Sequence, residues 1–552
     1  MKKKILSVLL ASVILSATAC NSKEYTAQKT YTVSETKIDT KNKSDGSVAA
    51  VTVTPEPEDE RILNTNERAR NQYDVLIKLD TENKTLNIEQ KLTYINNTGS
   101  DQEEIYFNLI PNAFTKKNGG IEVNSMKIGT EEIELKKVEE TVYRLPLTAP
   151  LEKGKSVTID MDYVVKIPKI SDRFGYNGNT YNLGNVLITP ALFENGKWLC
   201  QPYVDLGDAF YTEISDYRVS IDVPDGYMIA SSGTLINDVY IAENMRDFAF
   251  TASSDLAFLC EECEDIALNV YYPKDHPNTG KHVMDVAKRS LSLFNGLLGK
   301  YPYDTLNIVC TSMPGGIGGM EYPGLIMMTV EPDIESALDL YNGKITLDDY
   351  LKKMNDQYSG DKPDKLSDIE SSVETVSTDQ TYDAILYIVD SLTRSTAHEI
   401  AHQWFYGIVG NDEIRYPWID EGMCRFLEGY YAKYYKQGEN HTFSVFEMLK
   451  NHDQAVYEEH EGADRECRSV NLNESLYDLK RHSEDYGEIY YKGAAMIYHM
   501  YEKMGEDAFA EALKEYVETF AYTEVTPDEF IDFWSEKGDF KEMFEIYLPQ
   551  NS

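Results

Sequence analysis

Residues 397–405 read A-H-E-I-A-H-Q-W-F and place two histidines four positions apart. In an α-helix, side chains at positions i and i+4 lie on the same face, so His398 and His402 would direct their imidazoles toward one point. Imidazole nitrogens are common zinc ligands, and an open zinc site takes three protein ligands and leaves the fourth position to water. The segment therefore predicts a helix that supplies two ligands to one Zn²⁺ ion.

The third ligand is expected to be a carboxylate on a following helix. Glu421 stands in W-I-D-E-G, residues 418–422, with eighteen residues between it and His402. A helix, a turn and a returning helix of that length would bring Glu421 beside the histidines. The alternative is a pair of histidines satisfied by surface hydrogen bonds, which would make the position of Glu421 a coincidence.

Glu399 is the candidate general base. It directly follows His398, so it lies too far round the helix to act as a third ligand. It is nevertheless close enough to polarise a water molecule at the open position and to take its proton. His398, His402, Glu421 and Glu399 together predict hydrolytic chemistry.

This spacing resembles that of the gluzincin aminopeptidases typified by aminopeptidase N. A second hallmark of that family is G-x-M-E-N, and residues 318–322 read G-G-M-E-Y, with Tyr322 in place of the usual Asn. The resemblance implies that Glu321 binds the free α-amine of a peptide. It also implies that the backbone at Gly318, Gly319 and Met320 pairs with the peptide like an added strand.

The third hallmark of the family is a tyrosine shortly before a K-G pair. Residues 489–495 read I-Y-Y-K-G-A-A, which makes Tyr490 the counterpart. The resemblance implies that its phenol donates a hydrogen bond to the oxyanion of the transition state. Tyr486 and Tyr491 stand close enough in the sequence to be alternatives.

The rest of the chain divides by its periodicity into two structural parts. Short stretches of alternating apolar and polar residues, such as Tyr73 to Leu79, recur over residues 65–265 and predict an antiparallel β domain of sandwich type. Helical spacing dominates later, so residues 266–500 are expected to form an α-rich domain with a small sheet. The resemblance to the gluzincin aminopeptidases implies that this is a thermolysin-like, mostly α-helical zinc peptidase domain. The fold class is thus multidomain α+β. An acidic insertion is expected at 331–382 and terminal packing helices at 501–552.

The N-terminus carries an export signal. Three lysines precede an apolar run that is too short to span a bilayer, and residues 17–20 read A-T-A-C. This resembles a bacterial lipobox, which implies a signal peptide over residues 1–19 and a lipid on Cys20. Residues 20–64 are then expected to be a flexible linker that holds the protein at the outer face of a bacterial membrane. Ordinary secretory cleavage after Ala19 is the alternative.

Composition limits the possible functions. The 552 residues carry a net charge of −40, which repels phosphate backbones, so no nucleic acid partner is expected. Hydrophobic residues make up 42% of the chain, a share typical of folded globular domains.

The function predicted from these observations is a zinc-dependent aminopeptidase that acts on peptides with a free N-terminus. Three alternatives remain open: a zinc endopeptidase, a peptide-binding lipoprotein with weak or no activity, and a peptidase domain that assists a membrane-associated partner. Glu321 argues against the endopeptidase, because that enzyme has no terminal amine to bind. The presence of a candidate base, Glu399, argues against simple binding. Nothing in the sequence identifies a protein partner.

Overall fold

The structure is a computed structural model that describes residues 31–32, 54–55, 69–313, 317–357, 378–435, 445–460, 471–482 and 486–549. The predicted signal peptide and Cys20 lie outside these residues. Of the predicted linker, the structure describes the antiparallel pair β1 (Tyr31–Thr32) and β2 (Thr54–Pro55). Among the described residues, no helix combines the length and the apolar character needed to cross a bilayer.

The N-terminal part is built on an eight-stranded sheet. Buried and exposed side chains alternate most regularly in β3, where Tyr73, Val75, Ile77 and Leu79 face the core. All pairings are antiparallel except the one between β16 and β3. In spatial order the strands are β18 (Thr234–Ile236), β19 (Val239–Met245), β16 (Ser215–Asp222), β3 (Asn71–Asp80), β4 (Thr85–Ile95), β10 (Ser156–Lys166), β6 (Gly120–Ile128) and β7 (Glu131–Glu132).

Smaller sheets complete this β-rich part. Two have four strands each, and a short hairpin and a 3-10 helix, η1 (Ile110–Lys117), lie beside them. One sheet contains β13 (Thr189–Pro190), β5 (Gln102–Asn108), β9 (Val142–Leu151) and β8 (Lys136–Lys137); the other contains β11 (Phe174–Asn177), β12 (Thr180–Leu183), β20 (Phe250–Ser253) and β17 (Met228–Ser231); the hairpin is β14 (Phe193–Glu194) with β15 (Lys197–Trp198).

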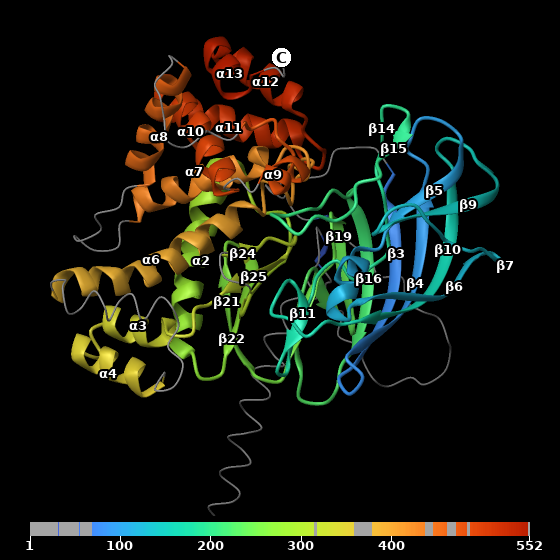
Figure 1. Ribbon diagram of the computed structural model, residues 1–552, viewed down its shortest axis with the longest axis horizontal. Coiled ribbons are helices and arrows are strands. Elements are labelled where there is room, and N and C mark those ends of the chain that lie inside the picture. Colours follow the sequence, from blue (N-terminus) through green and yellow to red (C-terminus); the bar gives the residue numbers. More distant parts are fainter. Residues whose placement is uncertain are drawn as a thin grey trace, which may run out of the picture.

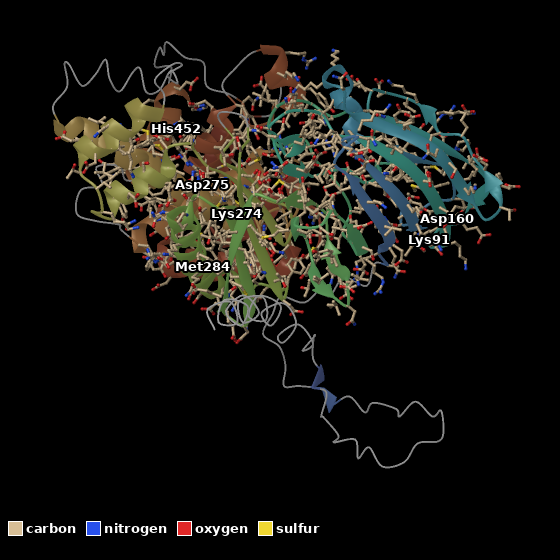
Figure 2. All side chains as sticks on the ribbon, turned by 90° about the horizontal axis from the view of Figure 1, so that it is seen from below. Lys91, Asp160, Lys274, Asp275, Met284 and His452 are labelled. Carbon is tan, nitrogen blue, oxygen red and sulfur yellow. The ribbon has the colours of Figure 1, made fainter. Side chains whose placement is uncertain are left out.

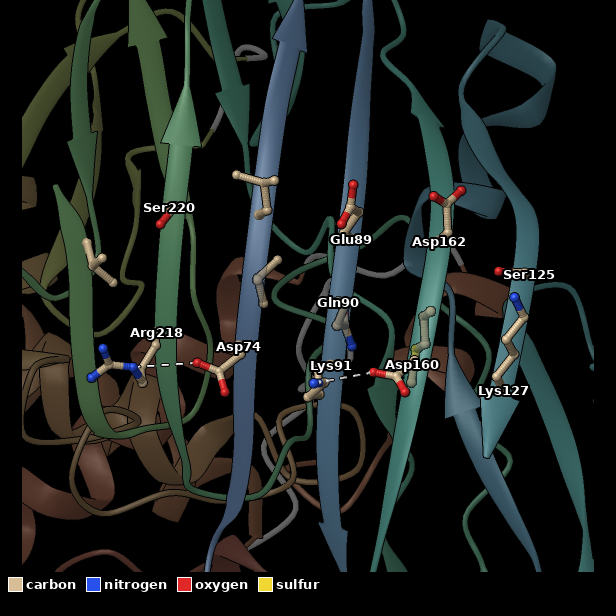
Figure 3. Close-up of a pocket in the computed structure, with 14 residues that line it drawn as sticks. Asp74, Glu89, Gln90, Lys91, Ser125, Lys127, Asp160, Asp162, Arg218 and Ser220 are labelled. Carbon is tan, nitrogen blue, oxygen red and sulfur yellow. Dashed lines mark ion pairs between the residues drawn. The ribbon is translucent and has the colours of Figure 1, made fainter. Parts of the chain in front are cut away.

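The outer face of the eight-stranded sheet is polar and slightly hollow (Figure 3), with a cavity volume of about 610 Å³. Charged side chains pair across its strands: Arg218 lies 3.5 Å from Asp74, and Lys91 lies 3.8 Å from Asp160. Figure 2 shows Lys91 and Asp160 at the end of the molecule opposite the helical part. None of the predicted site residues lines this hollow, so it is a solvated face remote from the candidate chemistry.

A five-stranded sheet begins the second part of the chain. Its order is β21 (Leu256–Cys263), β22 (Ile266–Pro273), β23 (Thr305–Thr311), β25 (Leu325–Thr329) and β24 (Gly319–Met320). The three central strands are parallel, and β23 is buried along its whole length. Because β21 pairs with β22 along its full length, it belongs to this sheet. The division between the two parts therefore lies before Leu256 and not at the predicted residue 265.

Helices pack on this sheet and form the rest of the second part, which confirms the predicted fold class of a β domain followed by a mostly helical domain (Figure 1). The helix α2 packs against β22, and α6 packs against α2 and α7. The helices are α2 (Pro277–Leu298), α3 (Ile334–Tyr341), α4 (Leu347–Gln357), α6 (Thr378–Ala401), α7 (Trp418–Tyr434), α8 (Val445–His460), α9 (Leu476–His482), α10 (Gly487–Met504), α11 (Glu506–Phe520), α12 (Pro527–Lys537) and α13 (Lys541–Tyr547).

The predicted insertion at 331–382 has regular structure in its described residues. It contains α3 and α4, and its last five residues are the start of α6. The carboxylate of Glu335 on α3 accepts hydrogen bonds from the backbone N–H groups of Asn278 and Thr279, both at 3.0 Å. The first N–H groups of a helix have no partner within the helix itself, so Glu335 of α3 caps the start of α2. The helix α3 is therefore part of the domain.

Candidate active site

The zinc-binding motif lies at the end of α6, where the predicted helix is observed. His398 is in the last turn, and His402 directly follows the final helical residue, Ala401. The backbone N–H of His402 still donates to the carbonyl oxygen of His398 at 3.2 Å, so the helical spacing of the two side chains is kept. Both side chains are buried, and they point to the same place.

Three ligand atoms converge there. The Nε2 atoms of His398 and His402 are 3.1 Å apart, and Oε2 of Glu421 lies 3.1 Å from the first and 3.4 Å from the second. A tetrahedral zinc ion with bonds of about 2.0–2.1 Å separates its ligand atoms by about 3.3 Å. Two imidazole nitrogens and one carboxylate oxygen at these separations fit one zinc ion. The structure thus brings together the three residues predicted as ligands.

The helix that carries Glu421, α7, approaches α10 closely. Glu421 is in the first turn of α7, and the next residue, Gly422, faces Gly493 of α10. A Cβ atom at Gly422 would lie 2.9 Å from the carbonyl carbon of Gly493, so neither position has room for a larger side chain. The two glycines set the distance between the helix that carries Glu421 and the helix that carries Tyr490.

Each histidine has a partner behind it. Nδ1 of His402 lies 3.0 Å from the carbonyl oxygen of Phe405, to which it donates, and this leaves Nε2 unprotonated for a metal. Nδ1 of His398 lies 3.8 Å from Oε2 of Glu428. Burial raises the pKa of Glu428, but Arg425 and Arg394 more than offset this and hold the pKa below its usual value. Glu428 is therefore a negative charge behind His398.

The sequence reasoning did not identify Glu428. It follows Glu421 by seven residues, which are two helical turns, so both carboxylates lie on one face of α7. That spacing was a usable signal. Its pairing with Arg394 of α6, at 3.2 Å, could be seen only in the folded chain.

Glu399 lies beside the three ligand atoms and is 6% exposed. Burial is the largest cause that raises its pKa to about 8, and the nearby charge of Glu421 raises it further, whereas His402 lowers it. Its Oε2 atom has no hydrogen-bond partner among the described residues. A Cβ atom at Gly319 would lie 2.4 Å from the carboxyl carbon of Glu399, so the glycine leaves room for this carboxyl group.

Glu321 follows β24, the edge strand of the five-stranded sheet, and is 2% exposed. One of its carboxylate oxygens lies within 4.8 Å of a ring nitrogen of His402. Its Oε1 atom has no hydrogen-bond partner among the described residues, and burial, followed by the charge of Asp208, holds its pKa well above the usual value. A buried carboxyl group with no cationic partner, next to the ligand atoms, fits a site for a bound cation.

The end of the zinc helix holds the segment that carries Glu321. Gln403 is fully buried, and its side-chain oxygen accepts a hydrogen bond from the backbone N–H of Gly324 at 2.9 Å. Its side-chain nitrogen donates to the carbonyl oxygen of Tyr322 at 3.3 Å. The distance between Glu321 and the histidines is therefore set by direct contacts.

Tyr322, which replaces the usual Asn of the motif, points away from the ligand atoms. Its side chain is fully buried, and its hydroxyl group donates to Oδ1 of Asn185 in the β-rich part at 2.8 Å. Nδ2 of Asn185 in turn donates to Oδ2 of Asp247 at 2.6 Å. Tyr322 thus connects β24 to the β-rich part of the molecule.

The structure separates Tyr491 from the other two candidate tyrosines. The ring centroid of Tyr490 lies 5.9 Å from that of His398, and burial followed by the charge of Glu421 holds its pKa well above the usual value. Tyr486 packs against Tyr490 with its centroid at 5.3 Å. Tyr491 instead accepts a hydrogen bond from Arg425 at 3.0 Å. Tyr490 is therefore placed beside the ligands, and Tyr491 is not.

Asp208 and Arg173 are residues near the site that sequence reasoning missed. They form an ion pair within the β-rich part, and Nη1 of Arg173 lies 3.3 Å from the sulfur of Met320, next to Glu321. The charge of Asp208 contributes to the raised pKa values of Glu321 and Glu399. No local motif marks either residue, because their position depends on how the two parts of the chain pack.

Comparison with known proteins agrees with this geometry. The family model described as "Peptidase family M1 domain" matches residues 388–547. The chain is 25% identical over 151 residues to leucine aminopeptidase 2-1 of Meyerozyma guilliermondii and 27% identical over 142 residues to human aminopeptidase Q. These matches cover 27% and 25% of this chain, and 24% and 13% of the relatives, so the chain aligns with less than a quarter of either relative.

Solved structures share the fold over most of the chain. An M1 zinc metallopeptidase from Deinococcus radiodurans superposes with a TM-score of 0.55 at 14% identity, covering 88% of this chain and 94% of that one. A mutant of the same enzyme, bound to a Tyr-Ser-Ala substrate, gives a TM-score of 0.54 at 14% identity with the same coverage. Residues 388–547 are thus similar to the domain of peptidase family M1, and the chain shares its two-part fold with M1 zinc metallopeptidases.

Proposed function

We propose that this protein is a zinc-dependent aminopeptidase that removes the N-terminal residue of peptides. The observation that carries the proposal is Glu321, a buried carboxyl group with no cationic partner among the described residues, within 4.8 Å of a zinc-binding histidine. The α-ammonium group of a peptide would supply the missing positive charge. It would also place the first peptide bond, and no other, beside the three ligand atoms.

His398, His402 and Glu421 would hold the zinc ion, which, when bound, polarises the carbonyl group of the substrate and lowers the pKa of a water molecule. Glu399 accepts a proton from the attacking water and returns it to the nitrogen of the leaving amine. Its raised pKa makes its ionised form a stronger base, and its unpartnered oxygen is available for that transfer. Tyr490 remains protonated at neutral pH and can donate a hydrogen bond to the developing oxyanion.

Substrate binding at the sheet edge follows from the position of β24. It is the outermost strand of the five-stranded sheet, and its residues Gly319 and Met320 precede Glu321. An extended peptide whose amine meets Glu321 could pair with this edge by backbone hydrogen bonds. The Deinococcus radiodurans relative, a variant of which was solved with a Tyr-Ser-Ala substrate, supports a short peptide as the ligand class.

We also propose that the protein is exported and attached by a lipid on Cys20 to the outer face of a bacterial membrane. The support is the lysine-rich start, the short apolar run and the A-T-A-C sequence of residues 17–20. The test is membrane fractionation of cells that express the full chain. We expect the wild type in the membrane fraction and the Cys20→Ala variant in the soluble fraction; wild-type protein in the soluble fraction would contradict lipid attachment.

The catalytic proposal is tested with aminoacyl fluorogenic substrates, each with a free and an N-acetylated terminus. The wild type is expected to cleave only the free forms. Glu321→Gln should raise KM for the free forms, because the ammonium loses its charged partner, and Glu399→Gln should lower kcat by about 10²–10⁴-fold with zinc retained. The matched control is Glu89→Gln, which removes an exposed carboxylate on the remote outer face and should change neither parameter.

The alternatives give different results in the same assay. Cleavage that ignores acetylation would indicate an endopeptidase. A wild type that binds zinc and cleaves none of the substrates would favour a peptide-binding protein or a peptidase that needs a partner.

A further inference from the structure

Arg246 is a buried arginine in the loop between β19 and β20, and it joins three separate segments of the molecule. It is 2% exposed, and its Nε atom donates to the carbonyl oxygen of Tyr406 at 2.7 Å. Its Nη2 atom donates to the carbonyl oxygen of Thr523 at 2.7 Å, and its Nη1 atom lies 2.8 Å from Oε1 of Glu524. The β-rich part thus binds the turn after the zinc helix and the loop before α12 through one side chain.

The carbonyl group that Arg246 holds is next to the one that orients a zinc ligand. Phe405 and Tyr406 are consecutive, and the carbonyl oxygen of Phe405 accepts the hydrogen bond from Nδ1 of His402 at 3.0 Å. The angle between the two peptide planes is set by the φ and ψ of Tyr406, and its φ is +99°. Such a value is rare for a bulky residue and persists only where the surrounding contacts impose it.

Arg246 is one of the contacts that fix this backbone, beside the hydrogen bonds from the N–H of Tyr406 to the carbonyl oxygen of Val409 at 2.8 Å and from the N–H of Gly407 to that of His402 at 3.0 Å. It is the one that comes from the β-rich part. Holding the carbonyl group of Tyr406 opposes relaxation of the strained residue to a negative φ, and relaxation would rotate the carbonyl group of Phe405 away from His402. Gly410 leaves the space that the arginine needs: a Cβ atom there would lie 2.2 Å from its Cζ atom. Nη1 of the arginine also donates to the carbonyl oxygen of Thr212 at 3.3 Å, so four contacts fix the position of the guanidinium group.

We propose that Arg246 is a positioning residue for zinc: through Tyr406 and Phe405 it sets the orientation of His402, and the β-rich part of the chain thereby tunes the metal affinity of the helical part. The inference rests on the proposed function only in taking His402 as a zinc ligand. It assigns to the contact between the two parts of the chain a role in the chemistry, beyond holding the molecule together.

The test measures the zinc dissociation constant of the full chain by competition with a chromophoric chelator, with no substrate present. Arg246→Lys keeps the charge but cannot reach all three segments in the same geometry. It is expected to bind zinc about 10–100-fold more weakly, the range found when a group that orients a metal ligand is lost. Glu524→Gln is the matched control, because it removes the ion pair and leaves the bond to Tyr406; its zinc affinity should stay within about twofold of wild type.

A second variant guards against a folding defect. Gly410→Ala keeps the arginine and displaces its guanidinium group, so it should weaken zinc binding in the same range while circular dichroism shows a native fold. Wild-type zinc affinity in folded Arg246→Lys or Gly410→Ala protein would overturn the proposal, as would an equal loss in Glu524→Gln. Zinc affinity is measured without turnover. A wild type that binds zinc but cleaves nothing would therefore contradict the proposed function, while the zinc affinities of the variants would still decide whether Arg246 positions His402.

Discussion

The absence of a side chain at Gly319 leaves room for the carboxyl group of Glu399, the candidate general base. The carboxyl group of Glu399 occupies the space that a Cβ atom at Gly319 would take. The general base and the strand that precedes Glu321 are therefore in direct contact, with no side chain between them. A substitution at this position changes the place of the base and leaves the three zinc ligands untouched.

Gly319→Ala is accordingly expected to lower kcat by roughly 10²-fold, because a displacement of a reacting group by about 1 Å has that effect. Zinc content, measured by atomic absorption, should remain at one ion per chain. Gly296→Ala is the control, since a Cβ atom at that position of α2 meets nothing within 4 Å. Unchanged turnover in Gly319→Ala would show that Glu399 is free to move and is not held as described.

At the scale of elements, the crossing of α7 and α10 determines the site. The two helices carry Glu421 and Tyr490, and they approach most closely where Gly422 faces Gly493. Trp418, at the start of α7, packs edge-on against Phe530 of α12 with ring centroids 5.0 Å apart. Trp418 also lies at the crossing, because a Cβ atom at Gly493 would be 3.5 Å from its own Cβ, so α12 contacts α7 beside the crossing.

We expect Gly422→Ala to destabilise the protein by about 1–3 kcal/mol, because the added methyl group meets backbone atoms of α10 that cannot turn aside. The better helix propensity of alanine, worth up to about 1 kcal/mol, is too small to compensate. The midpoint of urea unfolding measures the effect. A midpoint equal to or above that of the wild type would mean that the two helices can separate without loss.

At the scale of the whole molecule, buried polar groups connect the two parts of the chain. Arg246 forms one such link, and the series from Tyr322 through Asn185 to Asp247 forms another. Burial raises the pKa of Asp247 to about 7, only partly offset by the backbone N–H of Phe248. Proton uptake by this carboxyl group is therefore coupled to folding.

The sign of the resulting pH dependence follows from the raised pKa. The stabilising contribution of protonated Asp247 is fully present below its unfolded value of 3.8 and is lost as the pH rises through about 7. When the pH rises from 5 to 7, the loss of this contribution should lower the free energy of unfolding by roughly 2 kcal/mol. Asp247→Asn should abolish this decrease. Urea unfolding at both pH values, on both proteins, measures the difference; identical pH dependence in the two would contradict it.

Sequence reasoning succeeded where the signal is local. The i, i+4 histidines and the alternation of Tyr73 to Leu79 depend only on helix and strand geometry, and both elements are observed. It placed β21 in the wrong part of the chain, because alternation shows that a strand exists but not which sheet it joins. The acidic composition of residues 331–382 predicted an insertion and not the helix α3, although Ile334, Ala337 and Leu338 have helical spacing and are buried.

Residues that act through tertiary contacts could not be found from the sequence. Arg246 lies 160 positions from the carbonyl group that it holds, and no motif connects the two. Asp208 and Arg173 reach the site only because the β-rich part packs against β24. Such residues are identified by distance in the folded chain.

The central claim, that Glu321 and the zinc ligands together select the first peptide bond, is tested most directly by product analysis. Two ten-residue peptides of identical sequence, one with a free and one with an acetylated N-terminus, are incubated with the zinc-loaded protein and followed by mass spectrometry. The account predicts stepwise loss of single residues from the N-terminus of the free peptide and no change in the acetylated one. Internal cleavage of both peptides would contradict it.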